Sequence, residues 1–162
     1  MSMELQDGVV VVGVAEMKVT DDPRLTLVTY SLGSCLGVVI YDPIAKVGGM
    51  LPEALGDRAA TSFNPFKFVD TGAPLLFREA YKYGAKKGRM RVSVAGGAQI
   101  MDDSGFFNIG KRNLAALRRL FWKNGVMIRS EHVEGVCSRT LRLELATGRI
   151  FVRLGWGEEY EL

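Results

Sequence analysis

Short runs of apolar and β-branched residues dominate the first fifty positions of the chain. Residues 9–14, 25–30 and 36–41 have the composition of buried strands, and a further short strand is expected at 46–50. Gly33 and Ser34 are typical turn residues, so they predict a tight turn between the second and third of these strands. The residue after that turn, Cys35, therefore lies at the edge of a predicted strand.

The middle of the chain has a helical period instead. Apolar residues at spacings of four and three predict a helix over 71–88, and a second helix is expected between a cap at Asn108 and a stop at 124–125. The apolar stripe of the second helix consists of Leu114, Leu117 and Phe121. A strand is expected at 91–95, whereas residues 51–67 have no clear period and predict a loop that flanks the Cys35 region.

The last third returns to the alternation of strands. Residues 126–129 predict one strand, and residues 141–145 and 150–154 alternate apolar and polar side chains on either side of a glycine turn, which indicates a hairpin with one apolar face. Strands and helices do not alternate regularly, so the pattern favours an α+β fold over a parallel βαβ fold. No linker or repeat interrupts the chain, and we expect a single domain over residues 1–162.

Composition and charge are those of an ordinary soluble protein. The chain has 162 residues, 48% of them apolar, and a formal net charge of +3. No apolar run is long enough for a transmembrane helix and the N-terminus does not resemble a signal peptide, so we expect a cytoplasmic protein without direct membrane insertion. Basic residues cluster at 82–91 and 111–123, but no nucleic-acid motif accompanies them, and we expect no nucleic-acid partner.

Cysteine and histidine are too scarce for a metal site or a disulfide framework. The only cysteines are Cys35 and Cys137, and the only histidine is His132. We therefore expect no metal and no cofactor. At the predicted turn, Cys35 has two interpretations: a nucleophile near backbone N–H groups that would stabilise an oxyanion, or a small buried apolar side chain.

Several short motifs, in order, resemble one known family over about residues 9–159. The matching pieces are Leu32-Gly33-Ser34-Cys35 six residues after Thr29, Tyr41-Asp42-Pro43, Lys46-Val47-Gly48-Gly49-Met50, Lys67-Phe68-Val69-Asp70-Thr71, Ala95-Gly96-Gly97-Ala98, Asn108-Ile109-Gly110 with Arg112-Asn113, and Thr147-Gly148 with Val152-Arg153. In this order and spacing the chain resembles the bacterial chemoreceptor glutamine deamidases, the CheD family. Each piece is short, and the order and spacing of the set carry the resemblance.

The resemblance implies a catalytic Cys, His and Thr, of which this chain has two. Cys35 matches the nucleophile and Thr29 matches the residue that orients the base, although Thr29 also suits a strand simply because it is β-branched. Without gaps, the family's histidine falls on Pro52. Alternatively, residues 51–53 match the family's later Leu-Pro-Asp segment and the histidine is deleted. In both alignments the histidine is absent.

The resemblance also implies a fold and two competing functions. The implied fold is a cysteine-hydrolase sandwich of mixed and antiparallel sheets packed against each other, with helices on the outside. The first implied function is deamidation of glutamines on the cytoplasmic helices of chemoreceptors, with hydrolysis of glutamyl methyl esters as a second reaction. The alternative is a catalytically impaired module that regulates chemotaxis by binding receptors or a CheC-type phosphatase.

Loss of the histidine changes the expected rate. Proline has neither a side-chain acid nor a base, and general acid–base help is worth about 10²- to 10⁴-fold, so we expect activity reduced by about that factor unless another group substitutes. Glu53 is the nearest titratable neighbour, but it is a poor base unless burial raises its pKa. His132 is remote in sequence and more typical of a residue without a catalytic role, and Cys137 is interpreted as structural.

Overall fold

The strands of the protein form two sheets in a computed structural model that describes residues 5–6, 8–53, 69–99 and 109–162. The first sheet contains, in spatial order, β1 (Leu5–Gln6), β2 (Val9–Val11), β4 (Thr26–Leu32), β9 (Arg139–Glu144), β10 (Ile150–Leu154) and β11 (Glu159–Glu161). The second contains β3 (Lys18–Thr20), β6 (Val47–Glu53), β5 (Leu36–Asp42), β7 (Arg91–Gly96) and β8 (Ile128–Val133). Both sheets are mixed, because β2 and β4 run parallel, as do β7 and β8, while the other pairs are antiparallel.

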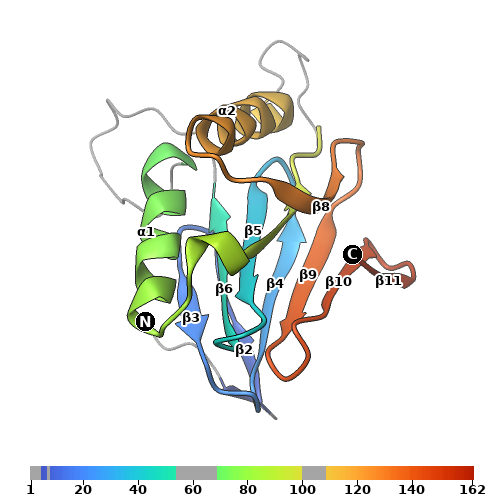
Figure 1. Ribbon diagram of the computed structural model, residues 1–162. Helices are drawn as coiled ribbons and strands as arrows, with labels where there is room; N and C mark the ends of the chain where they lie inside the picture. The colour runs from blue at the N-terminus through green and yellow to red at the C-terminus, as the bar shows by residue number, and fades with distance from the viewer. Residues whose placement is uncertain (1–4, 7, 54–68, 100–108) are drawn as a thin grey trace.

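Two helices cover the second sheet and give the molecule three layers (Figure 1). Helices α1 (Val69–Lys82) and α2 (Ile109–Lys123) pack on the side of that sheet that faces away from the first sheet, and a short 3₁₀ turn, η1 (Lys87–Arg89), precedes β7. A second apolar core fills the space between the two sheets. The predicted α+β class, with packed mixed sheets and outer helices, is confirmed.

The turn at residues 33–35 carries the chain from one sheet to the other. Strand β4 belongs to the first sheet and β5 to the second, so the two strands on either side of Cys35 do not pair with each other. Strand β5 is central in its sheet, with β6 on one side and β7 on the other. The residues that precede and follow Cys35 are thus held in different layers of the sandwich.

Several element boundaries differ from the predictions. Residues 51–53 were expected in a loop but continue β6, and residues 54–67 of that expected loop lie outside the described residues, as does the predicted cap at Asn108. Helix α1 ends at Lys82 rather than 88, because Gly84 adopts a φ of 95°. The apolar stripe of α2 and the hairpin of β9 and β10 are confirmed.

The β5–β6 turn, at the opposite end of these strands from Cys35, is held by Asp42. This fully buried carboxylate accepts hydrogen bonds from the backbone N–H groups of Ile44, Ala45 and Lys86, and it pairs with Arg89 at 2.9 Å. Burial alone would raise the pKa of Asp42, but these donors lower it to about 2. The two strands that carry the candidate site are therefore tied to η1 at their far end.

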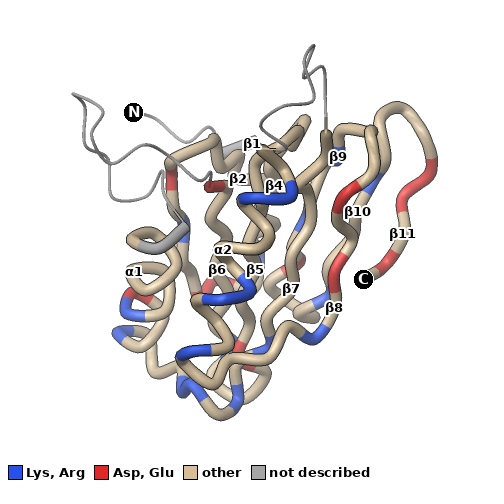
Figure 2. Tube along the Cα trace, turned by 90° about the horizontal axis from the view of Figure 1, so that it is seen from above, with Lys and Arg blue, Asp and Glu red and all other residues tan. Residues whose placement is uncertain are grey.

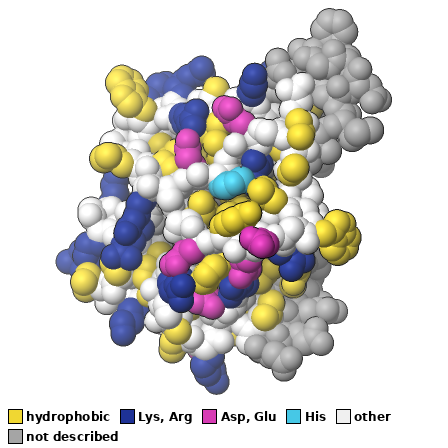
Figure 3. Space-filling view, turned by 90° about the vertical axis from the view of Figure 1, so that its right-hand side faces the viewer, with side chains coloured by type: hydrophobic (Ala, Val, Ile, Leu, Met, Phe, Trp, Pro, Cys, Tyr) yellow, Lys and Arg dark blue, Asp and Glu magenta, His cyan; other side chains and the backbone are white. Residues whose placement is uncertain are grey.

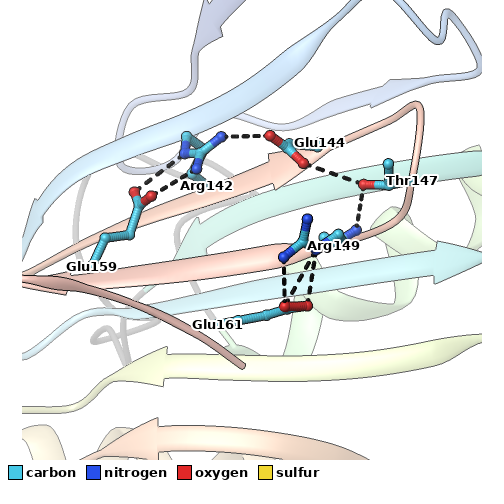
Figure 4. Close-up of polar contacts among 6 residues, drawn as sticks. All are labelled: Arg142, Glu144, Thr147, Arg149, Glu159 and Glu161. Atoms are coloured by element: carbon cyan, nitrogen blue, oxygen red, sulfur yellow. Dashed lines mark hydrogen bonds and ion pairs between the residues drawn. The ribbon is translucent and has the colours of Figure 1, made fainter.

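Charged side chains are distributed unevenly over the outside. Lysine and arginine lie along the helices, and acidic residues gather near β10 and β11 (Figure 2). On the outer face of the first sheet, Arg142 pairs with Glu144 and Glu159, and Arg149 pairs with Glu161 (Figure 4). These pairs attach the terminal strand β11 to its neighbours. Among the described residues, no helix has the length and apolar character needed to cross a membrane.

Candidate active site

Cys35 lies at the crossing between the two sheets and is partly buried. It packs against the apolar core between the sheets, and neither it nor the exposed Cys137 is in a disulfide. The strand before it is irregular: the register of β4 against β9 shifts between Thr29 and Leu32, and Ser31 in that interval has a φ of 55°. A positive φ outside glycine is uncommon, and here it belongs to a local bulge that turns the chain toward the second sheet.

The backbone of this corner is fixed by the end of β7. The carbonyl of Gly33 accepts the N–H of Ala98 at 3.0 Å, and the carbonyl of Cys35 accepts the N–H of Gly97 at 3.0 Å. Gly96 adopts a φ of 111°, and a Cβ placed on it would lie 2.2 Å from the carbonyl oxygen of Cys35. Only glycine fits at that position, because the backbone of β7 approaches the nucleophile candidate too closely for any side chain.

The positions of Thr29, Cys35 and Pro52 face the same space between the sheets. Thr29 is buried in β4 on the face of Leu27, opposite Leu141, both of which belong to the inter-sheet core. Pro52 is paired with Gly37 of β5, and Cys35 is the residue that immediately precedes this strand, two positions from Gly37. The structure therefore brings the three expected site positions to one side of the second sheet.

Pro52 fits inside a paired strand because its nitrogen faces away from β5. Its carbonyl accepts the N–H of Ala15 at 3.0 Å, on the side of β6 opposite to β5. The nitrogen and carbonyl of one strand residue point to the same side, so the missing N–H of proline costs the β5–β6 ladder no hydrogen bond. Any side chain at this position would project into the inter-sheet space.

Glu53 faces the opposite side of the sheet from Pro52. It pairs with Leu36, which belongs to the core beneath the helices, and it is fully buried. Within the described part of the chain neither oxygen of its carboxyl has a hydrogen-bond partner, and burial raises its pKa well above 4.5. Burial therefore favours the protonated form of this carboxyl, which lies on the other face of the sheet from the side chain at position 52.

His132 lies two strands away from the Cys35 strand. It is in register with Ala95 of β7, which is in turn in register with Gly37 of β5, so β7 lies between them. Its Nδ1 accepts a hydrogen bond from Nε of Arg139 at 2.8 Å, and burial followed by the charge of Arg139 lowers its pKa. The histidine is visible on the face shown in Figure 3, among hydrophobic and charged side chains. The structure thus does not place His132 next to Cys35.

Two buried polar residues near the corner had no role assigned to them from the sequence, although Asn113 belongs to one of the motifs that carry the family resemblance. Asn113 of α2 donates from Nδ2 to the carbonyl of Ser34 at 2.7 Å, and Arg139 donates to the carbonyl of Gly96 at 3.1 Å. A signal for Asn113 was present, because an asparagine beside Leu114 on the apolar face of a helix needs a buried partner. No group of three His, Cys, Asp or Glu side chains suited to a metal occurs in the described ranges.

Comparisons with known proteins cover nearly the whole chain. A family model described as CheD chemotactic sensory transduction matches residues 50–154. The probable chemoreceptor glutamine deamidase CheD 1 of Syntrophus aciditrophicus is 46% identical over 96% of this chain and 99% of its own length. The corresponding protein of Solibacter usitatus is 44% identical over 94% and 92%, and the chemoreceptor glutamine deamidase CheD of Thermotoga maritima is 36% identical over 94% and 96%.

Proposed function

The chain belongs to the CheD family of chemotaxis proteins, and from this premise we propose that it deamidates glutamine side chains of chemoreceptors with Cys35 as the nucleophile. The observation that carries the proposal is the setting of Cys35. It is partly buried at the crossing between the sheets, its backbone is fixed by β7, and positions 29 and 52 face the same space. Reactive cysteines need this combination of access and a held backbone.

The proposed reaction has two halves. The Cys35 thiolate attacks the carbonyl carbon of the glutamine side chain, the C–N bond breaks, and the nitrogen takes a proton from solvent water and leaves as ammonia, so that a thioester remains. Water then attacks the thioester carbon, the C–S bond breaks, and the glutamate product leaves as the thiol regains its proton. Hydrolysis of a glutamyl methyl ester follows the same route with methanol as the leaving group. Thr29 is an accessory group at the inner face of β4.

The missing imidazole limits this chemistry. Neither expected substitute is well placed, because Glu53 is directed toward the helices and His132 lies beyond β7. A histidine would both raise the thiolate fraction and protonate the departing ammonia. Without a general acid or base we expect turnover about 10²- to 10⁴-fold below that of a family member with the complete set.

Pro52 favours a second candidate function. In this alternative the protein is a regulatory binding module that keeps the fold and the docking surface but has lost most of its turnover. Its partners are then the cytoplasmic helices of chemoreceptors or a CheC-type phosphatase. Both candidates place the protein in the cytoplasm, where those receptor segments lie.

Ammonia release from a purified chemoreceptor separates the two candidates. We expect slow release by the native protein, loss of release in Cys35→Ala, and unchanged release in the control Cys137→Ala, whose thiol is exposed. Pro52→His restores an imidazole facing the inter-sheet space, and we expect it to raise the rate by about 10²-fold or more.

Two results would decide against the deamidase. Release that persists in Cys35→Ala excludes Cys35 as the nucleophile. If neither the native protein nor Pro52→His releases ammonia, while both still bind the receptor in a pull-down, the result supports the regulatory module instead. Methanol release from a methylated receptor, measured on the same variants, tests the ester reaction in the same way.

A further inference from the structure

Three consecutive carbonyl groups at the corner accept hydrogen bonds, and only one of the donors is a side chain. The carbonyls of Gly33 and Cys35 are held by backbone N–H groups at the end of β7, while the carbonyl of Ser34 between them is held by Nδ2 of Asn113. The Asn113 bond, at 2.7 Å, is the shortest of the three. It is also the only one of the three that a change of side chain removes without changing the backbone.

Asn113 is held in place by a close contact between α2 and β7. The residue is fully buried, on the same helix face as Leu114 and Leu117. One turn earlier, a Cβ placed on Gly110 would lie 2.3 Å from the carbonyl oxygen of Gly97, so the helix backbone sits directly on the end of β7. This contact gives the amide of Asn113 little freedom to move away from Ser34.

The Ser34 carbonyl determines the direction of the Cys35 N–H. Every peptide bond of the described residues is trans, and in a trans peptide the C=O and N–H point in opposite directions. A carbonyl of Ser34 aimed at α2 therefore aims the N–H of Cys35 away from α2. Donation by Asn113 also polarises that peptide, which makes its N–H more positive beside the thiol.

We propose that Asn113 is a positioning residue for Cys35: by holding the Ser34 carbonyl it orients the peptide that precedes the thiol. The proposal rests on the proposed function in treating Cys35 as the nucleophile. Its test measures thiol chemistry, however, and needs no receptor substrate. A failure of Asn113 to affect Cys35 is thus separable from a failure of the protein to release ammonia.

The test is the pH dependence of Cys35 alkylation by iodoacetamide, followed by mass spectrometry so that Cys35 and Cys137 are measured separately. Asn113→Leu removes the donor with similar volume, and Asn113→Asp replaces it with an acceptor at the alkaline pH of the titration. Leu117→Ala is the matched control, because it weakens the packing of the same helix face and removes none of the three hydrogen bonds of the corner. Circular dichroism establishes the temperature at which all four proteins are folded.

We expect the pH midpoint of Cys35 alkylation to rise in both Asn113 variants. The rate at neutral pH then falls by about three- to tenfold, which is the loss of thiolate for a rise of about half a unit to one unit. Leu117→Ala and the Cys137 peptide in every variant remain at native values. If native ammonia release is detected, kcat falls while KM stays within about twofold.

The proposal is overturned if the pH profile of Cys35 alkylation is native in both Asn113 variants. It is also overturned if the pH midpoint shifts equally in Leu117→Ala, because any weakening of α2 would then have this effect. A native protein whose Cys35 resists alkylation at every pH also overturns it. A shifted profile in a protein that releases no ammonia supports the positioning role and counts against the deamidase alone.

Discussion

Glu53 is a buried acid without hydrogen-bond partners in the described structure, at the strand end beside the candidate site. Its carboxyl is fully buried, and burial raises its pKa well above 4.5. The folded protein therefore binds this proton more tightly than the unfolded chain does. The associated stability is fully present below the unfolded pKa and is lost as the pH rises toward the folded-state pKa.

Glu53→Gln removes this titration and is expected to change how stability depends on pH. Between about pH 5 and about pH 8, we expect the melting temperature of the native protein to fall relative to that of Glu53→Gln by about 3–6 °C, which corresponds to about 1–2 kcal/mol. The measurement is thermal unfolding followed by circular dichroism at both pH values. The exposed Glu158→Gln is the control, and a constant difference between native and Glu53→Gln would contradict the buried neutral acid.

At the scale of elements, the contact between α2 and β7 sets the geometry of the corner. An alanine in place of glycine normally stabilises a helix by about 1 kcal/mol. At Gly110 the sign is expected to reverse, because the added Cβ would lie 2.3 Å from the carbonyl of Gly97 and 2.6 Å from that of Ala98. We expect Gly110→Ala to lower the free energy of unfolding by about 1–3 kcal/mol, measured by urea titration.

Gly88→Ala is the matched control for that substitution. A Cβ at Gly88 meets no atom within 4 Å, and the φ of Gly88 is not positive. The free energy of unfolding of the Gly88→Ala protein is therefore expected to differ from the native value by less than about 0.5 kcal/mol. A Gly110→Ala protein as stable as the native one would mean that α2 shifts on β7 at little cost. The corner would then be less rigid than its hydrogen bonds indicate.

Periodicity predicted those elements whose side chains repeat on one face. The β9–β10 hairpin alternates, and the α2 stripe recurs at helical spacing, so both were predicted from the sequence. The crossing at residues 33–35 was predicted only as a turn, because the apolar pattern of a buried strand does not indicate which of two sheets the strand belongs to. Residues 51–53 were missed as part of β6, because proline weighs against a strand unless one knows which way its nitrogen faces.

The sequence predicted candidate site positions from short motifs, but it did not predict the hydrogen bonds between distant segments that surround them. Family motifs placed Thr29, Cys35 and Pro52 as candidate positions, whose chemical roles remain predictions. The hydrogen bonds of Asn113 and Arg139 join segments 79 and 43 residues apart, and no local pattern contains such a partner. The sequence thus predicted the candidate positions, and the contacts that support them are visible only in the structure.

At the scale of the whole molecule, Cys35 joins the two sheets, so its environment depends on both layers. We expect the ratio of Cys35 to Cys137 alkylation rates to stay constant in urea until global unfolding, and then to approach about one in a single step. The measurement is pulsed alkylation along a urea titration, compared with far-ultraviolet circular dichroism. A ratio that changes at lower urea than the dichroism would show that the corner opens while the sheets remain intact.

The orientation of the Pro52 backbone also bears on the history of the fold. Because the ring nitrogen is turned away from β5, a point mutation between proline and histidine codons changes the side chain that faces the inter-sheet space and leaves the ladder between the two strands intact. Selection on turnover and selection on folding are then separable at this position. Under the proposed function, activity would then change at this position while the pairing of the sheet stays the same.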